Sequence, residues 1–396
     1  MSFGIKLIVL LIFVLPVKYT FIKTPHKIYL SLGSNLGNKF ENIQTAVNEI
    51  FNQIGSIAKI SPVYKTPALG FEGDEFLNCV LLVECHISAK KSLKKLLAIE
   101  KKMGRKRLES STFTSRLIDI DILFFDNECI DSKTLKVPHP EIQNRKFVLQ
   151  PLVDIHSDFV HPKMKLKVSE LLSNTKDESV LEKQSKWLRN PIKDFDISKF
   201  RYLAIEGNIG AGKTSLATKM ASDLNAKLIL ERFKENPFLP KFYEDASRFA
   251  FPLEMSFLAD RYQQLLEDIK QHDLFNDIVI ADYDAYKSLI FAKITLQDEE
   301  FSLYKKLFHL MHKELPKPDV YVYLYQNTER LLANIKKRGR VFEQGINSSY
   351  LQKINEGYLE FIKNQHDDSI KIIDISNKDF IENREDYLEL LKEILN

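Results

Sequence analysis

The sequence predicts two globular domains, an α+β domain followed by an α/β domain with a parallel sheet. Three observations support this. The chain has 396 residues, which is too many for one ordinary core and fits two domains of about 150–200 residues. Strands and helices mix irregularly in the first half, whereas long helical patterns separate the strands of the second. A polar stretch with little periodicity, 173–199, lies between them and is the expected linker. We therefore place the domains at 26–172 and 200–396, after an N-terminal extension, 1–25.

Composition narrows the class of protein. The net charge is +3 and 44% of the residues are apolar, so bulk charge gives no sign of a nucleic-acid partner. The three cysteines, Cys79, Cys85 and Cys129, form no Cys-x-x-Cys pair. They therefore predict neither a disulfide framework nor a zinc site, and they favour a reducing, cytoplasmic compartment.

Strand and helix patterns organise the first domain. Ile28, Leu30 and Leu32 alternate with polar or aromatic neighbours, which predicts a strand that ends in the turn 33–37. A helix is expected over 92–103, closed by Gly104. We further expect a helix over 41–54 and strands over 80–85 and 118–125.

The second domain opens with an apolar strand over 202–206, a glycine-rich turn and a helix over 214–224. Within the linker, Val180 to Leu188 is expected to form a short helix. Further strands are expected over 228–230, 278–281, 320–325 and 370–375.

The glycine-rich turn fits G-x-x-x-x-G-K-[ST] completely. Its glycines allow successive N–H groups to face a phosphate, and the following helix adds positive potential. Lys213 is the expected ligand of the β- and γ-phosphates of ATP, and the Thr214 hydroxyl is an expected Mg²⁺ ligand. The residues expected to bind ATP are Gly207, Asn208, Ile209, Gly210, Ala211, Gly212, Lys213 and Thr214.

An ordered set of residues follows this loop: Glu231, Asn236-Pro237-Phe238, Tyr243, Arg261, Asp282-Tyr283, Lys337-Arg338-Gly339-Arg340, Glu343 and 374–380. The set resembles the deoxynucleoside kinase family over about 200–396. The resemblance implies that Glu231 is the general base for the 5′-hydroxyl and that Arg338 and Arg340 are lid arginines on the transferred phosphate. It implies that Tyr243 and Glu343 hold the sugar 3′-hydroxyl, and that Asp379 and Phe380 lie in the loop that holds the ATP base. Glu254, Arg261, Asp282 and Phe291 are the further expected substrate contacts.

Three positions depart from this family. Glu254 stands where Gln is usual, and an ionised carboxylate suits the two adjacent donors of guanine, which favours deoxyguanosine. Tyr283 replaces an arginine, so Arg261 must do more of the phosphate-side work, and Asn334 replaces the first lid arginine. Phe249, Phe257 and Phe291 fit either the site or the core.

In the first domain, Asp119 and Asp121 lie two residues apart in a strand-like apolar run, so both carboxylates project from one face. Unpaired carboxylates on a half-buried strand are costly, and Mg²⁺ would remove that cost and bridge ATP phosphates. An exposed strand face is the alternative interpretation.

Several motifs accompany this pair: 33–37, 66–70, 76–78, 104–107, 137–140 and 144–147. With Asp119 and Asp121 they resemble 6-hydroxymethyl-7,8-dihydropterin pyrophosphokinase over about 26–165, which implies a ferredoxin-like α+β fold and transfer of pyrophosphate from ATP. Asp119 and Asp121 would hold two Mg²⁺, and Arg105 and Arg116 the phosphates. The other ATP contacts implied are Glu100, Arg107, His139 and Arg145; the pterin and lid contacts are Thr66, Pro67, Leu69, Asn78 and Phe147.

Some alternatives stay open here. His139 either contacts ATP or only caps a turn, and Arg145 either binds phosphate or pairs with a carboxylate. Phe113-Thr114-Ser115 replaces a frequent Trp-Gly-Pro, which leaves the closing of that loop in question.

We therefore expect a bifunctional enzyme that uses ATP and Mg²⁺ on small-molecule substrates, and the kinase resemblance implies a homodimer through the second domain. The alternative is that one half is a catalytically silent regulatory module. The apolar run 7–17 fits a secretory signal, a membrane-surface anchor or a start codon placed too far upstream. Because both activities need cytosolic ATP, we favour the last and expect a cytoplasmic protein, with an anchor as the alternative.

Overall fold

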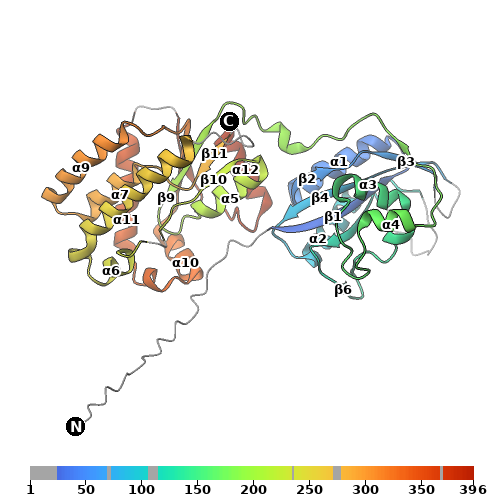
Figure 1. Ribbon diagram of the computed structural model, residues 1–396, viewed down its shortest axis with the longest axis horizontal. Helices are drawn as coiled ribbons and strands as arrows, with labels where there is room; N and C mark the ends of the chain where they lie inside the picture. Colours follow the sequence, from blue (N-terminus) through green and yellow to red (C-terminus); the bar gives the residue numbers. More distant parts are fainter. Residues whose placement is uncertain (1–24, 69–72, 106–114, 234–235, 271–277, 366–368) are drawn as a thin grey trace, which may run out of the picture.

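The computed structural model describes residues 25–68, 73–105, 115–233, 236–270, 278–365 and 369–396. Two bodies lie side by side along the long axis, and 173–199 crosses from one to the other (Figure 1). No helix in these ranges is long and apolar enough to cross a membrane. The expected extension 1–25 falls almost entirely outside them.

The first body is built on an antiparallel sheet of order β5-β1-β4-β3-β8, with β2 also paired to β4. β1 carries the predicted alternation, and its buried residues pack against the helices beside the sheet. The expected α+β architecture is confirmed, and the structure shows that its sheet is antiparallel. Its strands are β1 (His26–Ser34), β2 (Gly55–Ile60), β3 (Tyr64–Thr66), β4 (Phe76–Cys85), β5 (Asp119–Phe125) and β8 (Glu182–Lys183), with a small ribbon of β6 (Ile130–Asp131) and β7 (Lys136–Val137).

The predicted helices of this body are present with slightly different ends. Gly104 follows the second one with φ of +93°, the left-handed conformation expected of a helix-ending glycine. The helices are α1 (Lys39–Gln53), α2 (Ala89–Lys102), η1 (Ile142–Asn144), α3 (Lys146–His156) and α4 (Val168–Asn174).

The linker prediction was wrong in one respect, because Val180–Leu188 forms no helix. Val180 and Trp187 are exposed, so no apolar helix face exists to bury. The segment instead runs extended, and its strand β8 adds to the sheet edge at β3. After η2 (Pro191–Asp194), the chain enters the second body.

The second body has a five-stranded parallel sheet of order β10-β11-β9-β12-β13, as predicted. Its strands are nearly continuous apolar runs because helices cover both faces (Figure 1). The strands are β9 (Tyr202–Gly207), β10 (Lys227–Ile229), β11 (Val279–Ala281), β12 (Val320–Tyr325) and β13 (Ile370–Asp374). The helices are α5 (Lys213–Leu224), α6 (Leu239–Glu244), α7 (Ala246–Lys270), α8 (Lys287–Thr295), α9 (Asp298–His312), α10 (Thr328–Arg338), η3 (Val341–Glu343), α11 (Ser348–Lys363) and α12 (Arg384–Leu395).

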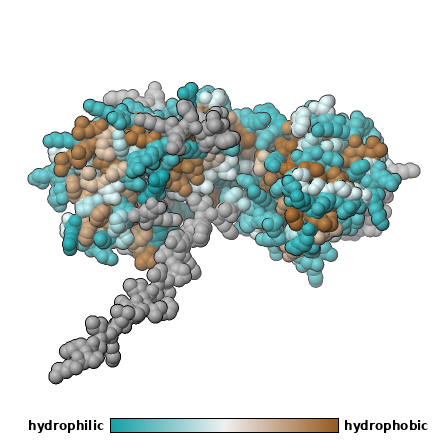
Figure 2. Space-filling model, viewed as in Figure 1, coloured by the Kyte–Doolittle hydropathy of each residue, from teal (hydrophilic) through white to brown (hydrophobic). Residues whose placement is uncertain are grey.

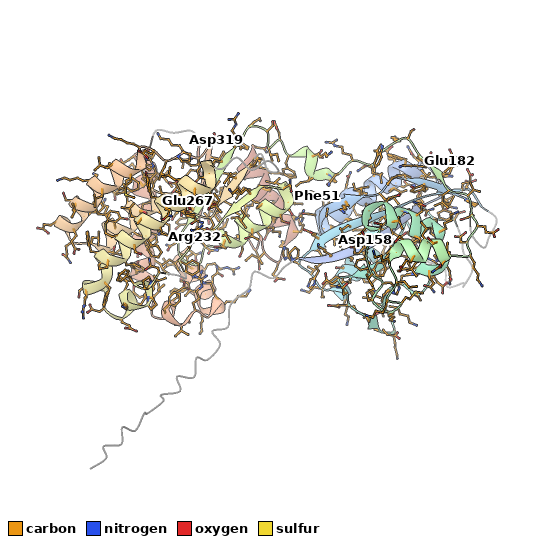
Figure 3. All side chains as sticks on the ribbon, in the orientation of Figure 1. Phe51, Asp158, Glu182, Arg232, Glu267 and Asp319 are labelled. Atoms are coloured by element: carbon orange, nitrogen blue, oxygen red, sulfur yellow. The ribbon has the colours of Figure 1, made fainter. Side chains whose placement is uncertain are left out.

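The two bodies are packed against each other through α1 and α12. Arg384, at the start of α12, donates to the Phe51 carbonyl at 3.1 Å, to Ser56 Oγ at 2.9 Å and to Asp223 Oδ2 at 3.1 Å. Phe51 lies on the side of the first body that faces the second (Figure 3). One apolar cluster runs through both bodies, so the interface is part of the core.

Candidate active sites

The glycine-rich turn leaves β9 and opens α5, as the sequence predicts. Gly210 and Gly212 have φ of +85° and +86°, which L side chains rarely adopt. A Cβ on Gly212 would lie 2.8 Å from Cζ of Phe380, so this turn also needs glycine for the close approach of that ring. Burial and the neighbouring Lys287 lower the pKa of Lys213 to about 8. Its Nζ donates to the carbonyls of Gly207 and Asn208, at 2.8 and 3.0 Å, which places the cation directly at the turn.

Asp282 joins this turn to the next strand end. Its Oδ2 accepts from the Thr214 hydroxyl at 2.5 Å, and its Oδ1 accepts from the backbone N–H of Glu231 at 2.8 Å. The sequence prediction gave Asp282 a substrate contact. In the structure it is the residue that fixes the positions of Thr214 and Glu231 relative to each other.

Glu231 is held between two cations. Its Oε1 accepts from Nε and Nη2 of Arg261 at 2.9 and 2.7 Å, and its Oε2 accepts from Nζ of Lys287 at 2.6 Å. Burial alone would raise the pKa of Glu231, but Lys287 and Arg261 outweigh it and hold the pKa well below its usual range. Sequence reasoning missed Lys287, the first residue of α8, because its partner Glu231 is 56 residues away in the chain.

The Tyr283 departure is explained by packing. Its ring is fully buried and its hydroxyl donates to Gln264 Oε1 at 2.9 Å, away from Glu231. Lys287 supplies a second cation beside Arg261, which the sequence expected to do more of the phosphate-side work. Asn334, the other departure, donates to the Gly210 carbonyl at 2.9 Å and so supports the turn.

Glu254 is buried in the same cavity as Glu231. Its Oε1 accepts from Thr295 Oγ1 at 3.1 Å, while Oε2 has no hydrogen-bond partner among the described residues. Burial raises the pKa of Glu254 to about 7. A buried acceptor without a partner is costly, and a ligand that donates to it would remove that cost.

Arg338 and Arg340 both donate to Glu343, at 2.5 and 2.9 Å, so the two lid arginines are held beside the cavity. Tyr243 lines that cavity as well, and burial followed by the charge of Glu343 raises the pKa of its hydroxyl. The predicted sugar pair is therefore brought together. Phe257 and Phe291 line the cavity too, and Phe257 also belongs to the neighbouring apolar cluster, against which Phe249 packs.

The carboxylates of the first body lie on β5, where Asp119 and Asp121 alternate with buried Ile120 and Ile122. Asp119 is paired with both Arg105 and Arg116, the latter at 2.6 Å. Burial, then repulsion from Asp119, raises the pKa of Asp121 to about 7. This acid pair therefore needs further positive charge.

Other predicted residues gather around this pair. Glu100 is buried, where it accepts from Arg105 and from the Ile120 N–H at 2.9 Å, so it orients an arginine and the strand. The Nε of Arg116 is buried without a partner in the described structure, which leaves a donor for an anion. On β4, Asn78 donates to Thr66 Oγ1 at 2.7 Å.

His139 accepts through Nδ1 from the Glu141 N–H at 3.2 Å, so it caps a turn, and its contact with ATP stays a prediction. Burial and then Arg145 lower its pKa to about 4, so the ring is neutral at pH 7. The guanidinium of Arg145 lies 6.0 Å from the centroid of Phe147. Pro67 is exposed next to Thr66, while Leu69, Arg107 and Phe113-Thr114 lie outside the described residues.

Comparison with known proteins identifies a family for each domain. The family described as "Deoxynucleoside kinase" matches residues 203–396, and the family "7,8-dihydro-6-hydroxymethylpterin-pyrophosphokinase (HPPK)" matches residues 29–157. A deoxyguanosine kinase of Bacillus subtilis is 42% identical over 47% of this chain and 92% of its own length. A 2-amino-4-hydroxy-6-hydroxymethyldihydropteridine pyrophosphokinase of Aquifex aeolicus is 40% identical over 34% of this chain and 83% of its own length. The chain belongs to both families.

A solved deoxyadenosine kinase of M. mycoides is 27% identical and covers 49% of this chain and 99% of its own, with a TM-score of 0.42. The two family matches and the B. subtilis and A. aeolicus relatives show that the chain is an enzyme with a pyrophosphokinase domain and a deoxynucleoside kinase domain, both ATP-dependent, and the predicted fusion is confirmed.

The pyrophosphokinase site fits Mg²⁺ by its donor set. Two carboxylates two residues apart on one strand offer hard oxygen ligands, and the raised pKa of Asp121 marks a place where positive charge is lacking. No group of three or more His, Cys, Asp or Glu that could hold a metal occurs among the described residues. Such a site suits Mg²⁺ that shares its coordination with phosphates and water.

Sequence reasoning also missed a buried carboxylate of the kinase domain, which directly precedes the glycine-rich turn. Glu206 is fully buried at the end of β9, where it accepts from the Tyr358 hydroxyl at 2.9 Å and from the Asp284 N–H at 2.8 Å. Burial raises its pKa to about 7. A lone Glu before a glycine turn gives no sequence signal for such a network.

Proposed function

We propose that the kinase domain phosphorylates the 5′-hydroxyl of a purine deoxynucleoside and that ionised Glu254 selects deoxyguanosine. The observation that carries this proposal is the buried Oε2 of Glu254, which has no partner in the described structure. Guanine presents N1–H and N2–H side by side, and a carboxylate accepts both. The 42% identical relative is named a deoxyguanosine kinase, which supports the same substrate.

In this reaction Glu231 accepts the hydrogen bond of the 5′-hydroxyl and takes its proton as the new P–O bond forms. Its depressed pKa makes it a weak base, so its main work is to aim the hydroxyl, with proton transfer late. Arg261 and Lys287 hold the carboxylate in place. Arg338 and Arg340 neutralise the charge on the transferred phosphoryl oxygens. Thr214 with Asp282 would hold Mg²⁺.

We propose that the pyrophosphokinase domain transfers pyrophosphate from ATP to 6-hydroxymethyl-7,8-dihydropterin and releases AMP. Asp119 and Asp121 would hold Mg²⁺, which neutralises phosphate charge when bound. Arg105 and Arg116 bind the phosphates, Asn78 hydrogen-bonds the pterin edge, and Phe147 stacks on its face. The catalytically silent alternative has no observation in its favour, because the predicted acids and arginines with described side chains lie together at each site.

The test of base choice uses pH. With a pKa of about 7, Glu254 is mostly ionised at pH 8 and mostly protonated at pH 6. A protonated carboxyl donates one hydrogen bond and accepts another, which suits N1 and the amino group of adenine. The ratio of kcat/KM for deoxyguanosine to that for deoxyadenosine should therefore rise about tenfold or more from pH 6 to pH 8.

The matched variant is Glu254→Gln, which keeps the shape and removes the titration. Its ratio should not change with pH, while a Glu267→Gln control on the exposed face of α7 should behave like the parent chain. An unchanged ratio in the parent chain, or an unchanged base preference in Glu254→Gln, contradicts the assignment.

Both families act on small molecules, and we keep the homodimer through the kinase domain as a prediction. Leu303 and Leu310 of α9 are 51% and 67% exposed, and hydrophobic residues gather over this end of the kinase domain in Figure 2.

A further inference from the structure

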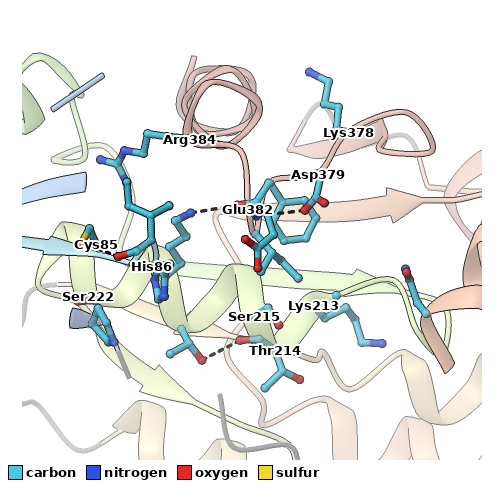
Figure 4. A pocket seen from close by; sticks show the side chains of 18 of the residues that line it. Cys85, His86, Lys213, Thr214, Ser215, Ser222, Lys378, Asp379, Glu382 and Arg384 are labelled. Atoms are coloured by element: carbon cyan, nitrogen blue, oxygen red, sulfur yellow. Dashed lines mark hydrogen bonds between the residues drawn. The ribbon is translucent and has the colours of Figure 1, made fainter. Parts of the chain in front are cut away.

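A cavity of about 620 Å³ lies between the two domains. Its kinase side is formed by the glycine-rich turn, α5 and the loop 378–382. Its other side comes from the pyrophosphokinase domain, at the end of α1 and the turn after β4, including Ile54, Cys85, His86 and Ile87. Figure 4 shows Cys85, His86 and Arg384 at one end of this cavity and Lys213 and Thr214 at the other. Its volume is that of a typical small-ligand site.

The cavity is strongly positive. Of the described residues that line it, nine are Lys or Arg and four are Asp or Glu. The positive charge around the glycine-rich turn suits the phosphates of a nucleotide. The rest of the cavity, beyond the turn, has room for its nucleoside.

Two cavities meet at the glycine-rich turn. Gly210, Lys213, Thr214, Arg338 and Arg340 line both the interdomain cavity and the cavity that contains Glu231 and Glu254. Phosphoryl transfer needs the donor and the acceptor on opposite sides of the moving group. Since the deoxynucleoside occupies the Glu231 side, the adenosine of ATP must extend into the interdomain side.

We propose that the kinase binds ATP between the two domains, with the adenosine against a wall supplied by Cys85–Ile87 of the pyrophosphokinase domain. This inference rests on the proposed deoxynucleoside kinase reaction. It makes the first domain a structural part of the second domain's ATP site.

Hydrogen bonds and close packing fix the position of Cys85–Ile87. Cys85 Sγ donates to the Ile87 carbonyl at 3.6 Å, which ties the turn together. Glu84, the preceding residue, accepts from Ser222 Oγ of α5 at 3.2 Å. Gly55, beside it, could not carry a side chain, since a Cβ there would lie 2.0 Å from the Glu84 carbonyl oxygen. The contacts of Arg384 with the Phe51 carbonyl and Ser56 Oγ then hold this wall against the kinase domain.

His86 is the group in the wall best suited to a base. Its ring is half-buried, and burial followed by the charge of Lys219 lowers its pKa. A neutral imidazole offers a flat face and one donor and one acceptor, which suits adenine. Across the cavity Lys219 donates to the Phe380 carbonyl at 3.0 Å, so the opposite loop is fixed as well.

His86 and the pterin site lie at opposite ends of one strand. Asn78 and His86 are eight residues apart, or about 26 Å along an extended chain. A change at His86 should therefore not alter the rate of the pyrophosphokinase reaction. That rate then serves as an internal check that the first domain is folded.

The experiment measures both reactions of the full-length chain. His86→Trp, which fills the adenosine end, should raise the KM for ATP in the deoxynucleoside kinase reaction about tenfold or more, and His86→Ala about threefold to fivefold. Ser88→Ala, two residues further on the exposed surface, is the matched control and should not change it. AMP release from the pterin reaction should stay at the parent level in all three.

Photolabelling supplies a readout that does not depend on turnover. 8-Azido-ATP bound to the full-length chain should label the peptide that contains Cys85–Ile87, and His86→Trp should suppress this label. A KM for ATP that stays within twofold of the parent value in His86→Trp, or no label on this peptide, overturns the inference. If the parent chain phosphorylates no deoxynucleoside at all, the proposed function itself fails, which is a different result.

Discussion

The carboxylates of the two active sites stand in opposite surroundings. In the kinase domain one acid, Glu231, lies between two cations, Arg261 and Lys287, which hold its pKa below the usual range. In the pyrophosphokinase domain two acids share one strand face. There Asp119 takes the nearby arginines, and the pKa of Asp121 rises to about 7. Glu231 thus has two protein cations for one negative charge, whereas no ion pair holds Asp121 among the described residues. The comparison teaches that protein cations set the position of Glu231, whereas the acid pair on β5 is left for the Mg²⁺ that we propose there.

The Asp121→Asn variant gives the strongest test of the proposed difference between the two sites. The amide cannot replace a carboxylate as a Mg²⁺ ligand, so AMP formation with the pterin should fall about 10³-fold or more. ADP formation with deoxyguanosine should be unchanged.

This variant should also fold. The folded-state pKa of Asp121 is raised above its unfolded value, so its ionised form destabilises the folded chain above that pKa, and an uncharged amide removes the effect. The Tm of Asp121→Asn at pH 8 should therefore equal or exceed that of the parent. Asp131→Asn, on the exposed ribbon, is the control for an acid-to-amide change. A rate for Asp121→Asn near that of this control at saturating Mg²⁺ would remove Asp121 from the metal site.

The kinase half of the comparison is tested by Glu231→Gln. The amide keeps the size but loses the charge that orients the 5′-hydroxyl and accepts its proton, so kcat for ADP formation should fall about 10²- to 10⁴-fold. The pterin reaction should continue at the parent rate. Turnover within threefold of the parent value would show that Glu231 is not the base.

The sequence predicted most of the fold because its strands are apolar and bounded by recognisable turns. All five kinase strands, and β1, β4 and β5, were placed within a few residues. Strand β2 was missed although it has six residues, and β3 and β8 were missed because they have three and two, too few for any periodicity. The false helix at 180–188 has the same origin, because pairing of β8 with β3 is a tertiary effect.

The site residues also fall into two groups, those that the sequence could predict and those that it could not. Residues inside contiguous motifs, such as Lys213 and Asp121, could be found from spacing alone. Lys287 and Arg384 could not, because their partners Glu231 and Phe51 are distant in the chain. The interdomain cavity was likewise invisible, since neither domain's motif specifies which face the other covers.

Lys287→Gln sharpens the account of Glu231. Removing one of two cations raises the pKa of Glu231 toward the ordinary carboxyl range, so the acid limb of kcat/KM should move to higher pH. The loss of a fixed cation should also lower kcat about 10- to 100-fold. A pH profile with deoxyguanosine measures both effects, and Lys293→Gln, on the outer face of α8, serves as the control. An acid limb at the parent position would show that Arg261 alone sets the charge of Glu231.

The smallest expected effect is the pH dependence of the Mg²⁺ requirement of the pyrophosphokinase reaction. Below a pKa of about 7, Asp121 is increasingly protonated, and protonation competes with Mg²⁺ for the same oxygens. The Mg²⁺ concentration for half-maximal AMP formation should therefore rise about tenfold from pH 8 to pH 6, at saturating ATP and pterin. Equal Mg²⁺ requirements at pH 6 and pH 8 in the pterin reaction would mean that Asp121 already has its cation from the protein, and the two sites would then be alike.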